Sequence, residues 1–112
     1  MLEHVVASAI RQHPEYVSGT RRDELALVRA VPGAIGKAGA ESVHAVALPD
    51  GRAWALKIDD GAARARPVVL AAALARDGVL REPGVDAAAI EAFGRHLLYG
   101  GAHPVGDLRV CL

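Results

Sequence analysis

The sequence has 112 residues with 13 Lys and Arg and 13 Asp and Glu, so its formal net charge is zero. A chain of this length forms one small domain or part of a larger one, and a neutral chain has no electrostatic attraction for nucleic acid or an anionic membrane. The single cysteine excludes an internal disulfide, and the longest apolar run, residues 68–75, is too short to cross a bilayer. The N-terminus lacks the basic start of a signal peptide, so we expect a soluble cytoplasmic protein.

The N-terminal third predicts one helix followed by a loop. Apolar residues at positions 2, 5, 6, 9 and 10 have the spacing of a helix that packs on a core, which predicts a helix over 2–12. Pro14 disfavours helical geometry at the residue before it and ends this helix. Residues 15–24 are polar and contain a glycine, which predicts an exposed loop, and residues 25–28 are expected to add a helical turn.

The middle third predicts three antiparallel strands, at 34–38, 42–48 and 53–59. The dipeptide Asp50-Gly51 lies between two β-rich segments and is a strong local indication of a hairpin. Alternation in the third strand places Trp54 and Leu56 on one face and Lys57 on the other. We expect the first face to be buried.

The last third predicts the main helix over residues 66–77. Pro67 suits the first turn of a helix, and Gly78 suits the position just beyond its end. Asp86 is placed to cap a shorter helix that runs to Phe93.

The tail, residues 99–106, is expected to be a loop, and residues 108–112 are expected to pair at a sheet edge. The fold class is therefore α+β: a three-stranded antiparallel sheet with packed helices.

The residues alone predict little catalytic chemistry. The five histidines have no i,i+4 pair and no cysteine partner, so no metal site is predicted. No serine is followed three residues later by lysine, so no nucleophile and base stand together in the sequence. We assign Asp59 and Asp60 to turns, and Arg64 and Arg66 to surface ion pairs.

Lys37 is the exception. It lies at the end of a predicted strand between Gly36 and Gly39, and such small neighbours let a ligand approach the backbone beside a local cation. The same pattern also fits a surface lysine on a strand.

Several linked motifs occur in order along the chain. They are His13-Pro14-Glu15, Val17-Ser18-Gly19-Thr20, Arg29-Ala30-Val31-Pro32-Gly33, Lys37-Ala38-Gly39-Ala40-Glu41, Ala47-Leu48-Pro49-Asp50-Gly51-Arg52, Ala55-Leu56-Lys57-Ile58-Asp59-Asp60-Gly61-Ala62, Arg64-Ala65, Gly100-Gly101, Pro104-Val105-Gly106 and Arg109. Together they resemble the C-terminal region of the asparaginase II family, which is related to serine β-lactamases and penicillin-binding proteins. Leu25 replaces a hydroxyl residue usual in that family, and Ser42 replaces a glycine.

The resemblance implies that residues 1–112 are a single partial domain, the C-terminal part of a β-lactamase-like serine hydrolase fold. The family's Ser-x-x-Lys nucleophile motif and its metal-holding cysteines lie upstream of anything in this sequence, so neither a cofactor nor activity of the chain alone is expected. Lys37 is implied as catalytic, as a second lysine across the cleft. Gly39, Ala40 and Glu41 are implied as substrate-binding, with the Ala40 N–H as an oxyanion donor.

The sequence is compatible with two functions. The first is an L-asparaginase, an amidohydrolase that releases ammonia from asparagine or a similar small molecule, in which a complementing N-terminal segment supplies the nucleophile. The second is a non-catalytic α+β module for binding or assembly, derived from the same fold. Glu41 fits an ammonium partner and a solvent-exposed turn equally well. In either case we expect an exposed apolar face and self-association.

Overall fold

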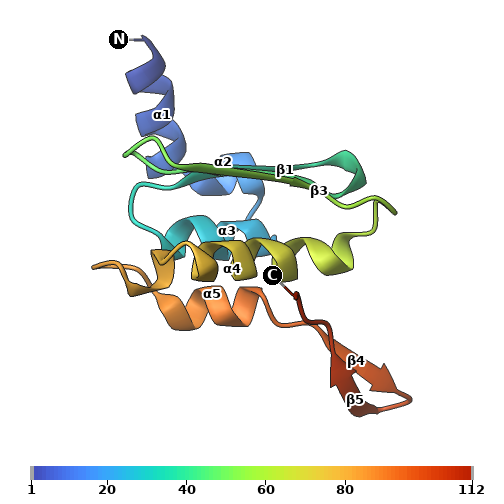
Figure 1. Cartoon of the computed structure of the whole chain (residues 1–112). Coiled ribbons are helices and arrows are strands. Elements are labelled where there is room, and N and C mark those ends of the chain that lie inside the picture. Colours follow the sequence, from blue (N-terminus) through green and yellow to red (C-terminus); the bar gives the residue numbers. More distant parts are fainter. Residues whose placement is uncertain (1, 112) are drawn as a thin grey trace.

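The computed structural model, which describes residues 2–111, is built as a sheet layered on helices. Strands β1 (Ile35–Gly39), β2 (Val43–Ala47) and β3 (Ala53–Lys57) form an antiparallel sheet in that order. Figure 1 shows helices α3 and α4 beneath this sheet and α5 beneath them. The α+β class and the three strands are confirmed, with boundaries that differ from the expected ones by at most two residues.

The turn between β2 and β3 forms where Asp50-Gly51 predicts it. Gly51 has a φ of +94°, which a residue without a Cβ adopts at little cost. The Leu48 N–H donates to the Arg52 carbonyl at 2.9 Å, and the Asp50 carboxylate accepts the Arg52 N–H at 3.0 Å. This local chemistry fixes the register in which Val46 pairs with Trp54.

The two faces of the sheet differ in what covers them. Opposed residues of an antiparallel pair share a face, so Val46 and Trp54 lie on the side that packs on the helices. Lys37 opposes Ala45, which opposes Ala55, and all three are exposed on the other side. We call this second side the open face.

Three helices agree closely with their predicted residue ranges, but the first does not pack on the core as predicted, since none of its residues is buried. Helix α1 spans Leu2–Gln12, α4 spans Arg66–Arg76, and α5 spans Ala87–Phe93. Gly78 follows α4 with a φ of +81°, and the Asp86 carboxylate caps α5 by accepting the Ala89 N–H at 3.1 Å. Short 3₁₀ turns η2 (Ala63–Ala65) and η3 (Val79–Arg81) flank α4.

The prediction of a loop over 15–24 is confirmed only for residues 19–22 and is wrong on both sides of them. Helix α2 occupies Pro14–Ser18 and helix α3 occupies Asp23–Ala30. Pro14 begins a helix as well as ending one, because its fixed φ suits a first helical turn. Polar residues 23 and 24 suit the positive end of the α3 dipole, so their polarity marks a helix start instead of a loop.

The predicted tail is also wrong. Residues 97–107 form a hairpin of β4 (Leu97–Gly100) and β5 (His103–Asp107), and residues 108–111 contain no strand. Gly101, with a φ of +62°, makes the turn. Pro104 argues against a central strand but is tolerated in this exposed two-stranded hairpin. In Figure 1 the hairpin projects away from the helices.

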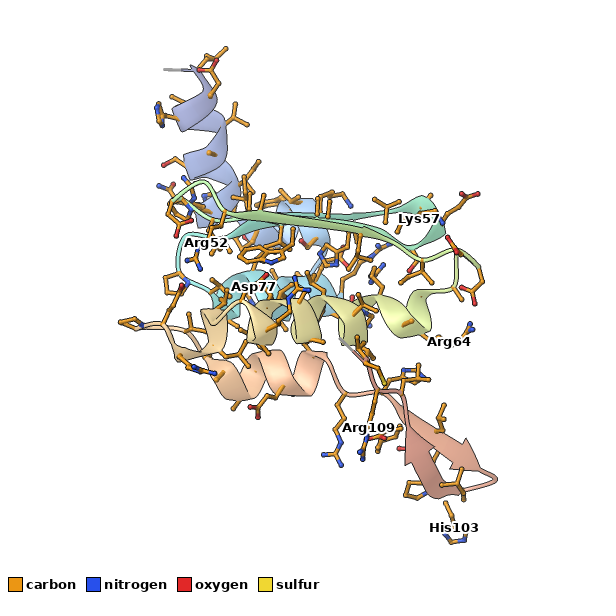
Figure 2. All side chains as sticks on the ribbon, in the orientation of Figure 1. Arg52, Lys57, Arg64, Asp77, His103 and Arg109 are labelled. Atoms are coloured by element: carbon orange, nitrogen blue, oxygen red, sulfur yellow. The ribbon has the colours of Figure 1, made fainter. Side chains whose placement is uncertain are left out.

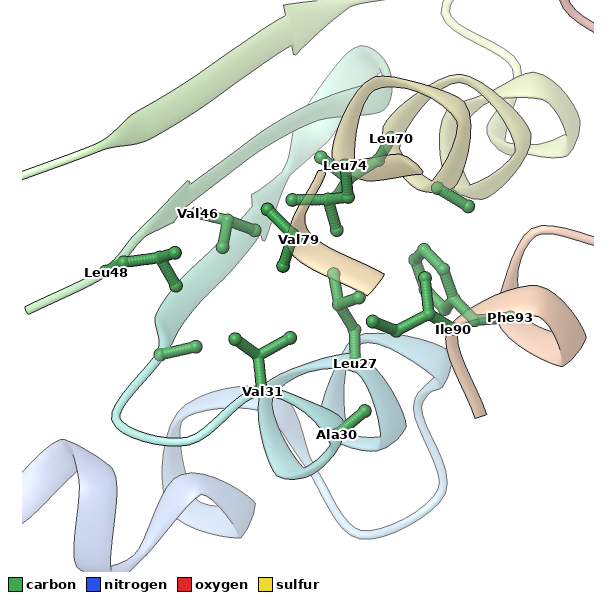
Figure 3. Packing of buried hydrophobic residues seen from close by; sticks show 12 residues of the cluster. Leu27, Ala30, Val31, Val46, Leu48, Leu70, Leu74, Val79, Ile90 and Phe93 are labelled. Carbon is green, nitrogen blue, oxygen red and sulfur yellow. The ribbon is translucent and has the colours of Figure 1, made fainter. Parts of the chain in front are cut away.

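The core lies between the sheet and the helices. Leu27 of α3, Leu70 and Leu74 of α4, and Ile90 of α5 are at most 1% exposed. Figure 3 shows them meeting Val46 of β2 in one cluster. Because this cluster contacts only the side of the sheet that packs on the helices, the open face contributes nothing to it.

The turn after β1 holds two non-glycine residues in the left-handed region. Turn η1 (Ala40–Ser42) has a φ of +57° at Glu41 and +61° at Ser42. The Ser42 hydroxyl is also buried without a hydrogen-bond partner. Ser42, which replaces a glycine of the family that the sequence resembles, therefore stands where glycine is less strained.

Ser42→Gly is therefore expected to stabilise the protein. Relief of the left-handed strain and loss of the unpaired hydroxyl outweigh the added freedom of the unfolded chain, for a net gain of about 1 kcal/mol. Urea unfolding at neutral pH measures it. The matched variant Glu41→Gly should gain less, because the Glu41 side chain is exposed. An equal or larger gain at Glu41 would contradict the assignment of a hydroxyl contribution.

Candidate functional site

Lys37 lies on the open face of β1 at the rim of an apolar hollow of about 540 Å³. Its ammonium donates to the neighbouring Ala38 carbonyl at 2.6 Å. The hollow is also lined by Ile10, Val17, Ile35, Gly36, Ala45, Ala47, Ala53 and Ala55, and by parts of Val46 and Trp54, two residues of the face that packs on the helices. Lys37 is the single charged residue among these lining residues, so a ligand entering the hollow meets one cation in an apolar setting.

The other three candidate residues lie beyond the hollow. Gly39 ends β1, and Ala40 and Glu41 begin the turn η1; all three are exposed, and none lines the hollow. Gly61 lies beside the turn, since a Cβ built there would make an ordinary van der Waals contact, 3.6 Å, with the Glu41 Cα. The Glu41 side chain is exposed to solvent.

No serine reaches a lysine within residues 2–111. Ser18 and Ser42 have buried hydroxyls without hydrogen-bond partners, and Ser8 is exposed on α1. The described part of the chain also contains no group of three His, Cys, Asp or Glu side chains that could hold a metal ion. Between residues 2 and 111, no helix has the length and apolar character needed to cross a membrane.

A buried ion-pair cluster joins the N-terminal ends of α3 and α4. Arg66 is 9% exposed and Glu24 is fully buried, which corrects the prediction that Arg66 pairs at the surface. The Arg66 guanidinium lies 3.1 Å from an Asp23 oxygen and 3.6 Å from a Glu24 oxygen. Arg64, by contrast, makes the expected surface pair with Asp60, at 2.6 Å. Both Glu24 oxygens lack a hydrogen bond. The cost of burying this carboxylate is therefore offset by the positive charge of the nearby guanidinium.

His44 is the buried titratable residue nearest in the sheet to Lys37. It stands opposite Ala38 on the covered face of β2, is fully buried, and meets the Phe93 ring edge-on at 6.4 Å. Burial first, and then the charges of Arg66 and Lys37, lower the pKa of the His44 imidazole to about 4, although Asp23 acts in the opposite direction. His44 is therefore neutral at pH 7. Alternation along β2 places His44 on the same face as the buried Val46, while its ring contact with Phe93 comes from the distant α5.

The depressed pKa of His44 predicts acid destabilisation. Between about pH 6.5, the pKa in the unfolded chain, and about pH 4, the unfolded state binds a proton that the native state does not. The free energy of unfolding should therefore fall as the pH falls through this window, by on the order of 3 kcal/mol in total. Urea unfolding at half-unit pH steps measures it.

His44→Leu should flatten the profile over the same window. His103→Leu is the matched control, since His103 is exposed at the hairpin tip, and it should leave the slope unchanged. An identical slope in His44→Leu and wild type would show that other groups cause the acid dependence.

The comparisons agree with the motifs along the whole chain. A family model described as L-asparaginase II matches residues 2–110, a range that includes Lys37, the turn η1 and the buried cluster. A search of curated proteins finds no match. Because the model covers nearly all of the chain, this protein belongs to the L-asparaginase II family.

Proposed function

We propose that this chain contributes Lys37 and the end of β1 to an L-asparaginase whose nucleophile stands on another polypeptide segment. The family match over residues 2–110 is the observation that carries the proposal. The position of Lys37, a lone cation at the rim of an apolar hollow, supports it, because a cation in a setting of low polarity attracts an anion more strongly than one in water. Asparagine brings such an anion, its α-carboxylate.

The proposed reaction is an acyl transfer to serine. The serine oxygen of a Ser-x-x-Lys motif bonds to the side-chain amide carbon while its lysine accepts the hydroxyl proton. That proton passes to the amide nitrogen as the carbon–nitrogen bond breaks, and ammonia leaves. Water then hydrolyses the acyl-serine, which releases aspartate and regenerates the serine hydroxyl.

Each candidate residue has a defined part in this scheme. Lys37 stabilises the negative charge of the substrate carboxylate and of the tetrahedral intermediate. The Ala40 N–H, just beyond Gly39, is proposed as one donor of the oxyanion hole. Glu41 is proposed to bind the substrate ammonium, which its exposed carboxylate permits. No cofactor takes part.

This proposal makes residues 1–112 a partial domain, the C-terminal part of a β-lactamase-like fold, in a cytoplasmic enzyme. The complementing segment would cover the open face and bring its serine towards Lys37. The lining of the hollow is almost entirely apolar, which suits a protein surface that buries it.

The same apolar lining favours the second candidate, a non-catalytic module that binds or assembles through the open face. It requires no nucleophile, and residues 2–111 contain no serine–lysine pair. Ammonia release separates the two functions.

The test measures ammonia release from asparagine by the purified chain, alone and after addition of the upstream segment of a full-length family member that carries Ser-x-x-Lys. We expect no activity from the chain alone, and activity once the segment is added. Activity of the chain alone that is lost when one of Ser8, Ser18 or Ser42 is replaced would place the nucleophile within this chain. No activity in either case favours the non-catalytic module.

A further inference from the structure

The hairpin of β1 and β2 ends in a tip, residues 38–44, which the turn η1 closes. His44 pairs with Ala38 there, in the second residue pair from the turn. The Ile58 N–H donates to the Ser42 carbonyl at 3.3 Å and ties the tip to the residue that follows β3. Opening of the hairpin by two residue pairs would therefore bring His44 out of the core while the rest of β1 and β2 stays paired.

The side chains buried at this end of the layer are polar. Among residues 2–111, buried nitrogen and oxygen atoms without a hydrogen-bond partner occur in Ser42 and His44 of the tip. They also occur in Glu24 and Arg66, which pair where α3 and α4 begin, and Figure 1 shows α4 beginning beneath the end of β1. The apolar core cluster contains none of the four residues. Each such atom loses its contacts with water on folding and gains no hydrogen bond in return, so this end of the layer is less stabilised than the core.

Backbone strain at the turn acts in the same direction. The left-handed φ values of Glu41 and Ser42 cost free energy only while the turn is closed, because an open segment can leave that region. The strain and the unpaired polar groups are thus concentrated in the tip and beneath it. Opening of the tip alone therefore requires less free energy than unfolding of the whole chain.

His44 is the titratable side chain that such an opening releases. The charged groups that act on it come from three neighbouring elements, α4, α3 and β1, and are Arg66, Asp23 and Lys37. The other carboxylate at the start of α3, that of Glu24, lies against Arg66. The neighbours of His44 on α5 and β3, which are Phe93 and Leu56, carry no charge.

Protonation of His44 is unfavourable while the tip is closed. It would place a third cation beside Arg66 and Lys37, and the second ring N–H would find no acceptor among residues 2–111. In the open state, water accepts hydrogen bonds from both ring N–H groups. The open state therefore binds the proton more readily than the closed state.

We propose that the tip opens locally while the rest of the sheet and the helices stay folded, and that protonation of His44 drives this opening. The tip is then a pH-sensitive switch built into the sheet. In the open state Gly39, Ala40 and Glu41 leave the positions described above, so acid would dismantle the candidate site without unfolding the chain. The proposal concerns the 112-residue chain by itself and does not rest on the enzymatic function.

Native-state hydrogen exchange at urea concentrations well below the unfolding transition tests the proposal. The His44 amide and the Ile58 amide report opening of the tip, and the amide of the fully buried Leu74, within α4, reports unfolding of the chain. At pH 7 the opening constants at His44 and Ile58 should exceed that at Leu74 by about tenfold or more. They should depend little on urea, whereas the opening constant at Leu74 should rise steeply with it, because only unfolding of the chain exposes a large surface.

The pH dependence is measured on the same amides after correction for the intrinsic rate of exchange. From pH 7 to pH 5 the opening constant of the tip should increase on the order of twentyfold, because the imidazole has a pKa of about 4 in the closed state and its ordinary pKa of 6.5 in the open state. His44→Leu should abolish this increase. His103→Leu is the control, since His103 is exposed on the distant hairpin, and it should retain the increase.

Three results would overturn the proposal. Equal opening constants and equal urea dependence at His44 and Leu74 would show that the tip opens only when the chain unfolds. Fast exchange at Ile58 but not at His44 would show that the end of β3 frays by itself. A local opening of the tip that does not change with pH in wild type would show that His44 stays buried, and this measurement holds even where His44→Leu does not fold.

Discussion

Lys37→Ala is expected to lower the turnover of asparagine at least a hundredfold in an enzyme assembled from this chain and a nucleophile-bearing segment. Loss of one preorganised group that stabilises the charge of the transition state costs about that much in other acyl-transfer enzymes. Because Lys37 is exposed and bonds only to the adjacent carbonyl among the described contacts, the fold should not change. Steady-state kinetics of ammonia release, with separate values of kcat and KM, provide the measurement.

Lys57→Ala is a closely matched control. The Lys57 ammonium also donates to the carbonyl of the following residue, at 2.5 Å, and its side chain is exposed at the end of β3. The two variants therefore lose the same kind of local contact and the same charge. If both lowered turnover equally, the effect would come from net charge and the catalytic role of Lys37 would be refuted.

Arg66→Met is expected to lower the free energy of unfolding by about 3 kcal/mol. Methionine keeps much of the apolar volume but leaves the fully buried Glu24 carboxylate without its buried partner, and breaking a buried pair on one side costs several kcal/mol. Arg22, at 3.7 Å from the other Glu24 oxygen, is largely in solvent and compensates little. Urea unfolding near neutral pH measures the change.

Arg64→Met should cost less than about 1 kcal/mol. The Arg64–Asp60 pair is shorter than the Arg66–Glu24 pair, at 2.6 Å against 3.6 Å, yet both of its partners are exposed. Burial and not distance decides the outcome. Adding Glu24→Gln to Arg66→Met should restore part of the loss, since it removes the buried charge. Equal losses at Arg64 and Arg66 would contradict this account.

The sequence predicts those elements that are determined by interactions between residues close together in the chain. The Asp50-Gly51 turn, the glycine after α4 and the Asp86 cap each act within a few residues, so each was readable from the sequence. The resemblance of the motifs to asparaginase II is confirmed by the family match.

The predictions are wrong where contacts between residues far apart in the sequence determine which side chains are buried. The sequence pattern predicts a polar loop around Glu24 and a surface position for Arg66, and both predictions are wrong. The two are 42 positions apart in the sequence and meet only because α3 and α4 begin side by side. The ring contact of His44 likewise comes from Phe93 in the distant α5. The position of Lys37 on a strand was predictable, but its apolar hollow requires Ile10 and Val17 from two separate helices.

Trp54 gives the molecule a built-in optical reporter. It is the one tryptophan of the sequence, its indole N–H donates to the Asp77 carboxylate at 2.7 Å, and the Arg52 guanidinium lies 5.9 Å from its ring centre. Figure 2 places Arg52 and Asp77 at the same end of the sheet and of α4. Fluorescence of this single indole therefore reports whether β3 is in contact with the C-terminal end of α4. Unfolding of the projecting hairpin alone would leave the emission unchanged, so a second probe that reports on β4 and β5 would reveal whether the two parts melt together.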